Sequence, residues 1–337
     1  LSRQVIRNDP KKLILVDFSE IALYQIKNEL EELELDSNII SFLLNITNRE
    51  KLEKICNSFN VQTIYHAAAY KHVPIVEENP FEAVSNNIFG TLNTVKAAIN
   101  SKVETFVFIS TDKAVRPTNI MGATKRFSEM ILQSLAAKED IAKRTRITMV
   151  RFGNVLGSSG SAIPLFQQQI SDGGPLTVTD PEVVRYFMTI PEAAELVIQA
   201  GAMGQGGDLF VLDMGEPVQI LELAKRLISL SGKEVKNEEN PEGDIEIIFT
   251  GLRPGEKLFE ELLIGDDVRD TQHRQIFKAN EEYISWKEVE EYLIEIKEAY
   301  SSSDHIKLRN IFQQTVSGFK PEKDIVDVIY LEKNKTP

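Results

Sequence analysis

Short apolar runs alternate with helix-length segments over the first 151 residues, and this alternation limits the fold more than any other feature. The runs that look like buried strands are residues 12–17, 62–65, 105–109 and 146–151. Helical patterns cover residues 20–33, 86–100 and 124–135. Strands joined by helices of this length form a parallel sheet with crossover helices. We therefore predict a doubly wound α/β fold that binds ligands at the carboxyl ends of its strands.

The pattern changes beyond Arg151. Residues 153–166, GNVLGSSGSAIPLF, have glycines and serines spaced like a phosphate loop. No Lys-Ser/Thr pair closes this segment, so a flexible crossover into a second domain is favoured over a phosphate loop. Helices are predicted at 191–203 and 218–231, strands at 208–213 and 245–250, and a charged helical region from about Ser285.

Composition excludes several classes of function. The chain has 38 basic and 51 acidic side chains and a formal net charge of −13, which disfavours nonspecific binding to nucleic acid. Its single cysteine, Cys56, cannot form an internal disulfide, and no apolar run approaches the ~20 residues needed to cross a bilayer. We infer a reducing, cytoplasmic setting.

Asp17 ends the first predicted strand and has no arginine beside it. A carboxylate there accepts hydrogen bonds from a ribose and repels a 2′-phosphate, which favours NAD over NADP. A helix N-cap or a solvated loop acid is the alternative. Residues 1–12 resemble the helix that follows a glycine loop, yet no such loop precedes them. We expect the first strand and its glycine loop to be missing from this chain.

Polar residues follow the next two strands. After residues 62–65 come the small side chains of Ala67, Ala68 and Ala69, which leave room for a flat cofactor, and then Lys71 and His72 at the cleft. His66, between the strand and these alanines, is interpreted as a core residue with satisfied hydrogen bonds.

The sequence Ser110-Thr111-Asp112-Lys113 ends the following strand. Its polar groups can serve as hydroxyl donor, proton donor and base, and a solvated turn is the alternative. Lys125 follows twelve residues later, at the opening of a helix.

Seven phrases in order, between about residues 12 and 263, carry a family resemblance: HAAAYKHVPIVEENP, NNIFGT, FISTDKAVRPTN, MGATKR, RFGNVLGSSGSAIPLF, RYFMTIPEA and GLRPGEKLFEEL. The chain resembles the extended short-chain dehydrogenase/reductase family. Within it, the chain is similar to the UDP-N-acetylglucosamine 4,6-dehydratases of bacterial capsule and O-antigen biosynthesis. Met121 stands where such enzymes normally have tyrosine, so the resemblance is to a Met-bearing branch.

The resemblance implies a reaction. A nicotinamide cofactor takes hydride from C4 of the sugar, water leaves across C5 and C6, and the hydride returns to C6. A C4 ketone acidifies the C5 proton, so a base and a partner acid can expel the C6 hydroxyl. By resemblance Asp112 is the acid and Lys113 the base. Lysine acts as a base only if burial and neighbouring cations lower its pKa.

The thioether of Met121 cannot take a proton from the C4 hydroxyl. We hypothesise that a water held by Thr111 and Lys125 does so. The resemblance implies that Lys125 also binds the nicotinamide ribose, and Met121 would pack against the sugar or the nicotinamide. A dead site is the alternative, disfavoured because Asp112, Lys113 and Lys125 all remain.

Further contacts are implied by resemblance alone. Arg185 and Arg253 would clamp the pyrophosphate, since guanidinium groups pair with phosphate oxygens at two points. Asn154 and Glu256 resemble residues that meet the diphosphate and the uridine. Asn87 is expected on the cofactor side. Asn45 falls where relatives usually have an acid or a small residue beside the adenine, which leaves the adenine contact open.

The predicted organisation is Rossmann-like with a smaller α/β substrate domain. Residues 1–153 form an N-terminally incomplete NAD-binding domain, and 154–275 form mainly the UDP-sugar domain, with 190–213 returning to the cofactor domain. Residues 276–337 form a helical extension. No metal site is predicted. A homo-oligomer built through the helices beside the active site is expected, with membrane attachment through an N-terminal segment left open.

Two rival functions remain. A nucleotide-sugar 4-epimerase on the same fold needs no acid-base pair for C5 and C6, so the Asp112-Lys113 pair disfavours it. A non-catalytic protein that binds NAD or a UDP-sugar is the other rival.

Overall fold

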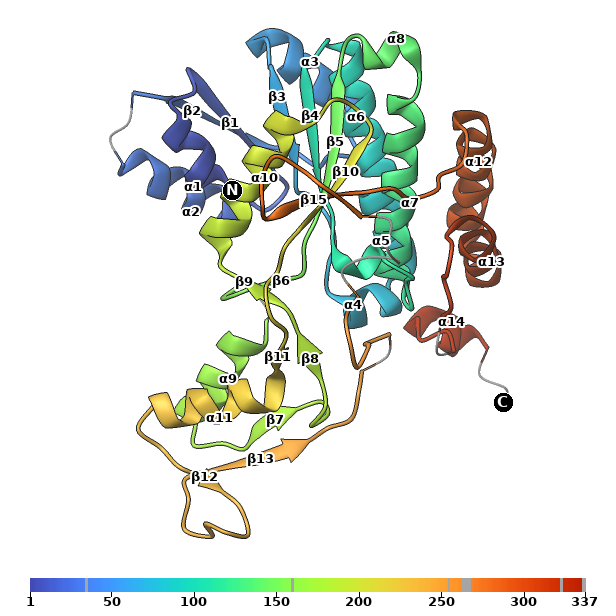
Figure 1. The fold of residues 1–337 in the computed structure, drawn as a ribbon. Helices are drawn as coiled ribbons and strands as arrows, with labels where there is room; N and C mark the ends of the chain where they lie inside the picture. The colour runs from blue at the N-terminus through green and yellow to red at the C-terminus, as the bar shows by residue number, and fades with distance from the viewer. Residues whose placement is uncertain (34–35, 159–160, 254, 262–267, 322–323, 335–337) are drawn as a thin grey trace.

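A mainly parallel sheet forms the centre of the larger domain (Figure 1). The computed structural model describes residues 1–33, 36–158, 161–253, 255–261, 268–321 and 324–334. Among these residues the sheet has the strand order β14-β15-β10-β5-β4-β3. The parallel strands are β3 (Thr63–His66), β4 (Thr105–Ile109), β5 (Arg146–Arg151) and β10 (Asp208–Leu212). The predicted α/β fold with a parallel sheet is confirmed.

Both faces of this sheet are buried, because successive side chains of a strand point to opposite sides. Phe106 and Phe108 of β4 pack with α6 (Thr91–Asn100) and α7 (Ile120–Ala136) on one face. Val107 packs with α10 (Ile190–Met203) on the other face. This two-sided burial explains why the strands read as continuous apolar runs. The helix predicted at 86–100 begins within a π-helix, Val84–Gly90, and continues as α6.

A second, two-stranded parallel sheet lies on the β3 side of the large sheet (Figure 1). It pairs β1 (Lys12–Asp17) with β2 (Asn38–Leu43), joined by α2 (Glu20–Glu31). The short helices α1 (Ser2–Val5) and η1 (Ile6–Asn8) precede β1. The sequence analysis missed β2 and the following helix α3 (Arg49–Phe59). The missing first strand and glycine loop stay a prediction.

The smaller domain has its own core. The elements between β5 and α10 are β6 (Asn154–Val155), α9 (Ala162–Ser171), β7 (Leu176–Val178), β8 (Val184–Arg185) and β9 (Phe187–Met188). The chain then returns to the large sheet for α10 and β10 and leaves again through β11 (Val218–Gln219), α11 (Ile220–Leu230), β12 (Val235–Lys236) and β13 (Ile245–Phe249). Buried apolar side chains of α9, β7, α11 and β13 pack together. The predicted helix at 218–231 begins only at Ile220, because β11 pairs with β8.

One correction concerns the start of the predicted helical extension. Residues Ile276–Ala279 form β15, which pairs antiparallel with β10, and β14 (Val268–Asp270) pairs with β15. The chain therefore completes the large sheet before the helices α12 (Trp286–Ser302), α13 (His305–Thr315) and α14 (Val328–Lys333) begin. Ser285 and Glu288 form a capping box at the start of α12.

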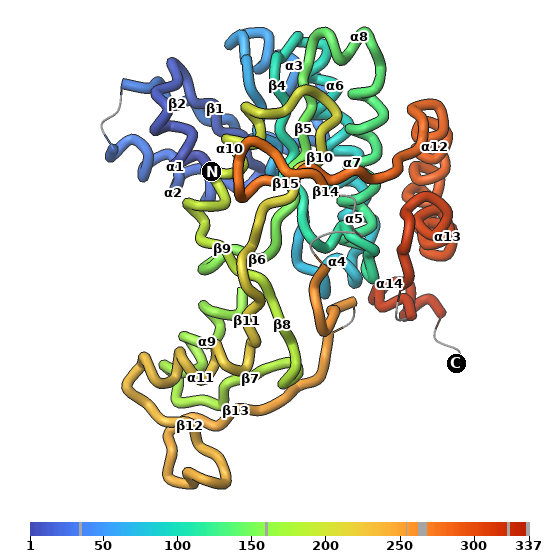
Figure 2. Tube along the Cα trace, in the orientation of Figure 1, coloured from blue at the N-terminus to red at the C-terminus, as the bar shows by residue number. Residues whose placement is uncertain are grey.

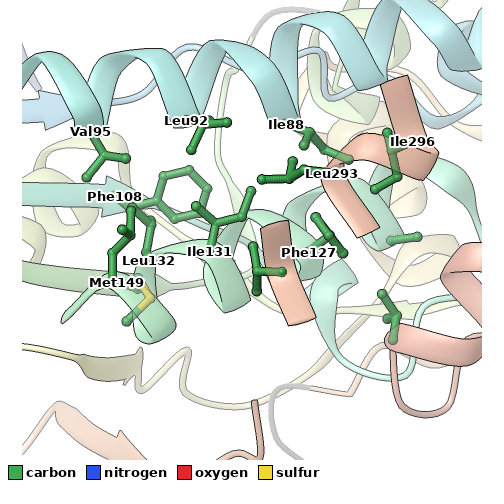
Figure 3. Packing of buried hydrophobic residues seen from close by; sticks show 14 of the residues in the cluster. Ile88, Leu92, Val95, Phe108, Phe127, Ile131, Leu132, Met149, Leu293 and Ile296 are labelled. Atoms are coloured by element: carbon green, nitrogen blue, oxygen red, sulfur yellow. The ribbon is translucent and has the colours of Figure 1, made fainter. Parts of the chain in front are cut away.

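Helices α12 and α13 cover α7. Figure 3 shows Leu293 and Ile296 of α12 beside Phe127 and Ile131 of α7. Every residue of α7 is buried as a result. The tube view places α12 and α13 on the outer side of α7 (Figure 2). None of the described helices is long and apolar enough to cross a membrane.

Leu293→Ala should lower the free energy of unfolding by about 2–5 kcal/mol, because it opens a cavity between α12 and α7. Leu293 is 8% exposed, whereas its neighbour Ile294 is 62% exposed. The matched control Ile294→Ala should therefore change stability by no more than about 0.5 kcal/mol. Urea unfolding followed by circular dichroism measures both. Equal effects of the two substitutions would contradict the packing of α12 on α7.

Candidate active site

A cavity of about 280 Å³ lies between the carboxyl ends of the large sheet's strands and the smaller domain. Both domains contribute to its wall, as expected for a ligand site at a sheet edge. It is lined by these predicted site residues: Lys71, His72, Asp112, Lys113, Asn154, Arg185, Arg253 and Glu256. The structure thus brings together residues that lie up to 185 positions apart in the sequence (71 to 256).

The turn after β4 carries the predicted acid-base pair. Thr111 caps the short helix η3 (Asp112–Ala114), and its hydroxyl donates to Asp112 Oδ1 at 2.8 Å. Lys113 Nζ lies 3.2 Å from the same oxygen. Helix α7 approaches this turn so closely that a Cβ at Gly122 would lie 2.1 Å from the carbonyl oxygen of Lys113. Only glycine permits that approach, so Gly122 sets the position of the pair.

Glu260 is a site residue that the sequence analysis missed. Its side chain is 5% exposed and forms ion pairs with Lys113 Nζ at 2.8 Å and with Arg185 Nε at 3.2 Å. Asn154 Nδ2 donates to it at 2.8 Å. The phrase GLRPGEKLFEEL contains several glutamates, and the sequence does not show which of them turns inward.

The charge state of Lys113 differs from the expectation. Burial lowers the pKa of this lysine, but the carboxylates of Asp112 and Glu260 outweigh burial, and the pKa is raised overall. The condition for a basic Lys113, a pKa lowered by burial and neighbouring cations, is not met in this structure, because its nearest charged neighbours are two acids. Burial raises the pKa of Asp112, yet Lys113 and the hydrogen bonds of Asp112 lower it overall.

Lys125 has the opposite surroundings. Its ammonium donates to the carbonyl of Ile109 at 2.6 Å and lies 3.7 Å from the centre of the Phe108 ring. Burial lowers the pKa of Lys125 to about 7, against the attraction of Glu129. Met121, one turn earlier on α7, is 3% exposed and packs in the hydrophobic core. Neither side chain belongs to the cavity wall.

Arg185 is fully engaged in this structure. A guanidinium has five N–H donors, and those of Arg185 meet the carbonyls of residues 184, 257 and 258 and the carboxylates of Glu256 and Glu260. Arg253, by contrast, is exposed beside the cavity. Arg185 must therefore exchange partners before it can clamp a pyrophosphate, whereas Arg253 needs no such exchange.

The predicted cofactor contacts lie on the β1–β3 side. Asp17 is exposed at the end of β1, and its Oδ1 accepts from the amide of Ser19 at 2.8 Å. Asn45 Oδ1 accepts from both the amide and the hydroxyl of Thr47 at 2.9 Å. Ala67, Ala68 and Ala69 follow β3 and are exposed or half-buried.

Asn87, another predicted cofactor contact, is buried between the loop after β3 and α7. It is 1% exposed, and its Nδ2 donates to Tyr70 O and Thr124 Oγ1. Its Oδ1 accepts from the amide of Tyr70 and from Asn86. The side-chain amide has no hydrogen-bonding capacity left. Asn87 therefore holds the loop after β3 against α7.

His66 is a core residue, as predicted. It is 3% exposed, and its Nε2 lies 2.9 Å from Thr91 Oγ1. Burial, with a smaller effect of Lys125, lowers the pKa of His66 to about 3, so the ring is neutral at physiological pH.

A buried charge network lies beneath the site. Arg151 and Glu129 have fully buried side chains, and Arg151 Nη2 lies 2.6 Å from Glu129 Oε2. Glu129 also accepts from Ser110 Oγ at 2.6 Å and pairs with Arg126. Arg151 pairs in addition with Glu281, which follows β15. The sequence analysis did not identify this network, which fixes the end of β4 next to the turn that carries Asp112 and Lys113.

Comparison with known proteins identifies the family. Residues 1–281 match the family model described as polysaccharide biosynthesis protein. The chain belongs to this family. The capsular polysaccharide biosynthesis protein CapD of Staphylococcus aureus is 48% identical over 92% of this chain and 50% of its own length. The probable polysaccharide biosynthesis protein EpsC of Bacillus subtilis is 49% identical over 81% of this chain and 44% of its own length. The chain spans about half the length of these relatives.

Solved structures support the extended short-chain dehydrogenase/reductase fold. Pen from Bacillus thuringiensis aligns with a TM-score of 0.73 and 32% identity, covering 88% of this chain and 92% of Pen. DesIV of Streptomyces venezuelae, a dTDP-glucose 4,6-dehydratase, aligns with a TM-score of 0.66 and 18% identity, covering 92% and 94%. At that identity the second likeness concerns the fold alone.

Arg151→Met should lower the free energy of unfolding by about 3–5 kcal/mol, because it leaves a buried carboxylate without its principal partner. The exposed pair of Lys143 and Glu139 offers the control. Lys143→Met should change stability by no more than about 0.5 kcal/mol. Chemical denaturation of the two variants makes the comparison. A loss below about 1 kcal/mol for Arg151→Met would show that the network does not hold the sheet edge.

Proposed function

We propose that this chain catalyses the NAD-dependent dehydration of UDP-N-acetylglucosamine to a UDP-4-keto-6-deoxy-N-acetylhexosamine for bacterial surface glycans. The observation that carries the proposal is the Asp112-Lys113 pair in the wall of a cavity that Arg253 and Lys71 also line. An acid and a base side by side suit the loss of water across C5 and C6. The family membership and the 48% identity to CapD support a protein of polysaccharide biosynthesis.

NAD fits one side of this site. Asp17 would accept hydrogen bonds from the adenosine ribose, the alanines after β3 would leave room for the flat ring, and Lys125 would bind the nicotinamide ribose. The buried ammonium of Lys125 has the Ile109 carbonyl as its hydrogen-bond partner, which leaves donors for ribose hydroxyls. When bound, NAD would accept a hydride from C4 and return it to C6. The exposed carboxylate of Asp17 favours NAD over NADP.

The cavity offers the groups that a nucleotide sugar needs. Arg253, Lys71 and His72 are exposed along its wall and would meet the diphosphate. Asn154 and Glu256 are proposed for the diphosphate and uridine. Arg185 joins the clamp once the phosphate replaces its carboxylate partners, since phosphate and carboxylate use the same guanidinium geometry.

Lys113 becomes a base only after it gives up a proton. The two carboxylates that keep it charged are also the acceptors nearest to its nitrogen, at 3.2 and 2.8 Å. Transfer of one proton from Lys113 to Asp112 produces a neutral amine and a carboxylic acid together. These are the protonation states that removal of the C5 proton and expulsion of the C6 hydroxyl require. The water held by Thr111 and Lys125 remains our hypothesis for the C4 proton.

A 4-epimerase is the second candidate. The UDP-glucose 4-epimerase of Rickettsia rickettsii is 35% identical over 77% of this chain and 75% of its own length. Epimerisation needs C4 chemistry alone, however, and gives no role to an acid-base pair at C5 and C6. We further propose a cytoplasmic homo-oligomer. Because α12 and α13 cover α7, its interface would use a surface other than the expected helices.

Incubation of the purified protein with UDP-N-acetylglucosamine and NAD tests the proposal. Mass spectrometry should detect a product lighter than the substrate by one water, and borohydride should reduce its 4-keto group. A product of unchanged mass, epimerised at C4, would support the epimerase instead. Binding with neither product would support a non-catalytic protein.

Lys113→Ala should still bind UDP-N-acetylglucosamine but lose exchange of the C5 proton with deuterated solvent. Turnover should fall about 10²- to 10⁴-fold, the usual effect of removing a positioned base. Isothermal titration calorimetry and proton NMR measure binding and exchange separately. Lys143→Ala, at an exposed position just before the amino end of β5, serves as control. A near-normal kcat for Lys113→Ala would refute the assignment of the base.

A further inference from the structure

The acid of the pair has a neighbour from the other domain. Asp112 and Glu260 both contact the ammonium of Lys113, at 3.2 and 2.8 Å, so the two carboxyl groups are neighbours. Asp112 Oδ1 accepts from Thr111 and Lys113. Asp112 Oδ2 is buried and has no donor partner among the described residues.

A proton on Glu260 resolves this arrangement. Two buried carboxylates side by side repel each other, and a buried oxygen without a donor is costly. A proton on Glu260 would remove the repulsion and would offer a donor to the unsatisfied Oδ2 of Asp112. The pKa directions of the two groups agree with this placement of the proton. Burial first and Asp112 second raise the pKa of Glu260. Lys113 and the hydrogen bonds to Asp112 outweigh burial and lower the pKa of Asp112.

The segment that carries Glu260 is anchored on both domains. The carbonyl of Gly255 accepts from Thr118 Oγ1 at 3.2 Å and from Asn119 Nδ2 at 3.0 Å, at the start of α7. Arg185 of β8 binds the carbonyls of residues 257 and 258. Residues 255–261 therefore bring Glu260 to the catalytic turn only while the two domains are held together.

We propose that Glu260 is a positioning residue for the dehydration, whose carboxyl group holds the proton that keeps Asp112 supplied as an acid. This proposal rests on the proposed function. It makes the working acid a carboxyl pair assembled across the domain boundary, in which Glu260 keeps one proton while Asp112 receives a second from Lys113.

The proton balance of the reaction closes around this pair. Asp112 gives its proton to the C6 hydroxyl as the C6–O bond breaks and water leaves, with the electron pair coming from the C5–H bond. Lys113 takes the C5 proton and later returns it to C5 when the hydride removed from C4 arrives at C6. The C4 hydroxyl loses one proton during oxidation, and one proton must return to Asp112. These two cancel, so the net change is the loss of one water.

Infrared spectroscopy tests the pair without any turnover. The ligand-free protein near neutral pH should show the C=O band of a protonated carboxylic acid, and Glu260→Gln should abolish it. Glu261→Gln should keep the band, because that neighbouring side chain is 39% exposed and pairs with Arg116. Asp112→Asn should also abolish it, because Glu260 then loses the neighbouring carboxylate, keeps only Lys113, Arg185 and Asn154 as its contacts among the described residues, and ionises. Persistence of the band in Glu260→Gln, or its absence from the unmodified protein, would overturn the proposal.

Kinetics separates this proposal from the proposed function. In Glu260→Gln, loss of water should slow by about 10²-fold or more, with UDP-sugar binding retained. The fall in rate at alkaline pH should begin at lower pH, because Asp112 alone loses its proton earlier. An unchanged pH profile would refute the role of Glu260. If no nucleotide sugar is dehydrated at all while the band behaves as expected, the proposed function fails and the carboxyl pair stands.

Discussion

The buried ion pair between Arg151 and Glu129 is the constraint on which the site depends. Both side chains are fully buried, and desolvating two charges costs several kcal/mol per ion unless good geometry and further hydrogen bonds offset it. The further partners of Arg151 and Glu129 come from separate parts of the fold: Ser110 at the end of β4, Arg126 on α7, and Glu281 after β15. The charges of Arg151 and Glu129 are satisfied only when these elements meet, and this fixes the sheet edge with the turn that carries Asp112 and Lys113.

The cover of α12 and α13 complements this network. The network needs a dry environment, and α7 supplies it only because its outer face is packed against the two C-terminal helices. Arg126 also donates to the carbonyl of Glu282, immediately before α12 begins. The charge network and the apolar packing of Figure 3 therefore lie on two sides of α7. Together they hold the start of this helix, which carries Met121 and Lys125.

The sequence predicted what local pattern determines. Strands buried on both faces, such as β4 and β5, gave continuous apolar runs, whereas β2 is half-exposed and interrupted by Ser41, so it was missed. Helix α3 did have an amphipathic signal, with Leu52 and Cys56 on its buried side. The residues of the cavity followed from motifs. Glu260 and the partners of Arg151 did not, because those contacts depend on which of many charged side chains the tertiary fold turns inward.

The charge states of Lys113 and Lys125 could not be predicted from the sequence, because they depend on which groups the fold places beside each ammonium. Lys113 lies between two carboxylates that keep it charged, while Lys125 has a carbonyl and an aromatic face, and burial lowers its pKa to about 7. At neutral pH a large share of Lys125 is then an uncharged amine, which can accept a proton as the thioether of Met121 cannot. The hypothesis of a water held by Thr111 and Lys125 thereby gains a physical basis. Methionine in place of tyrosine at position 121 need not leave α7 without a base, because the side-chain nitrogen of Lys125 lies one turn further along the helix.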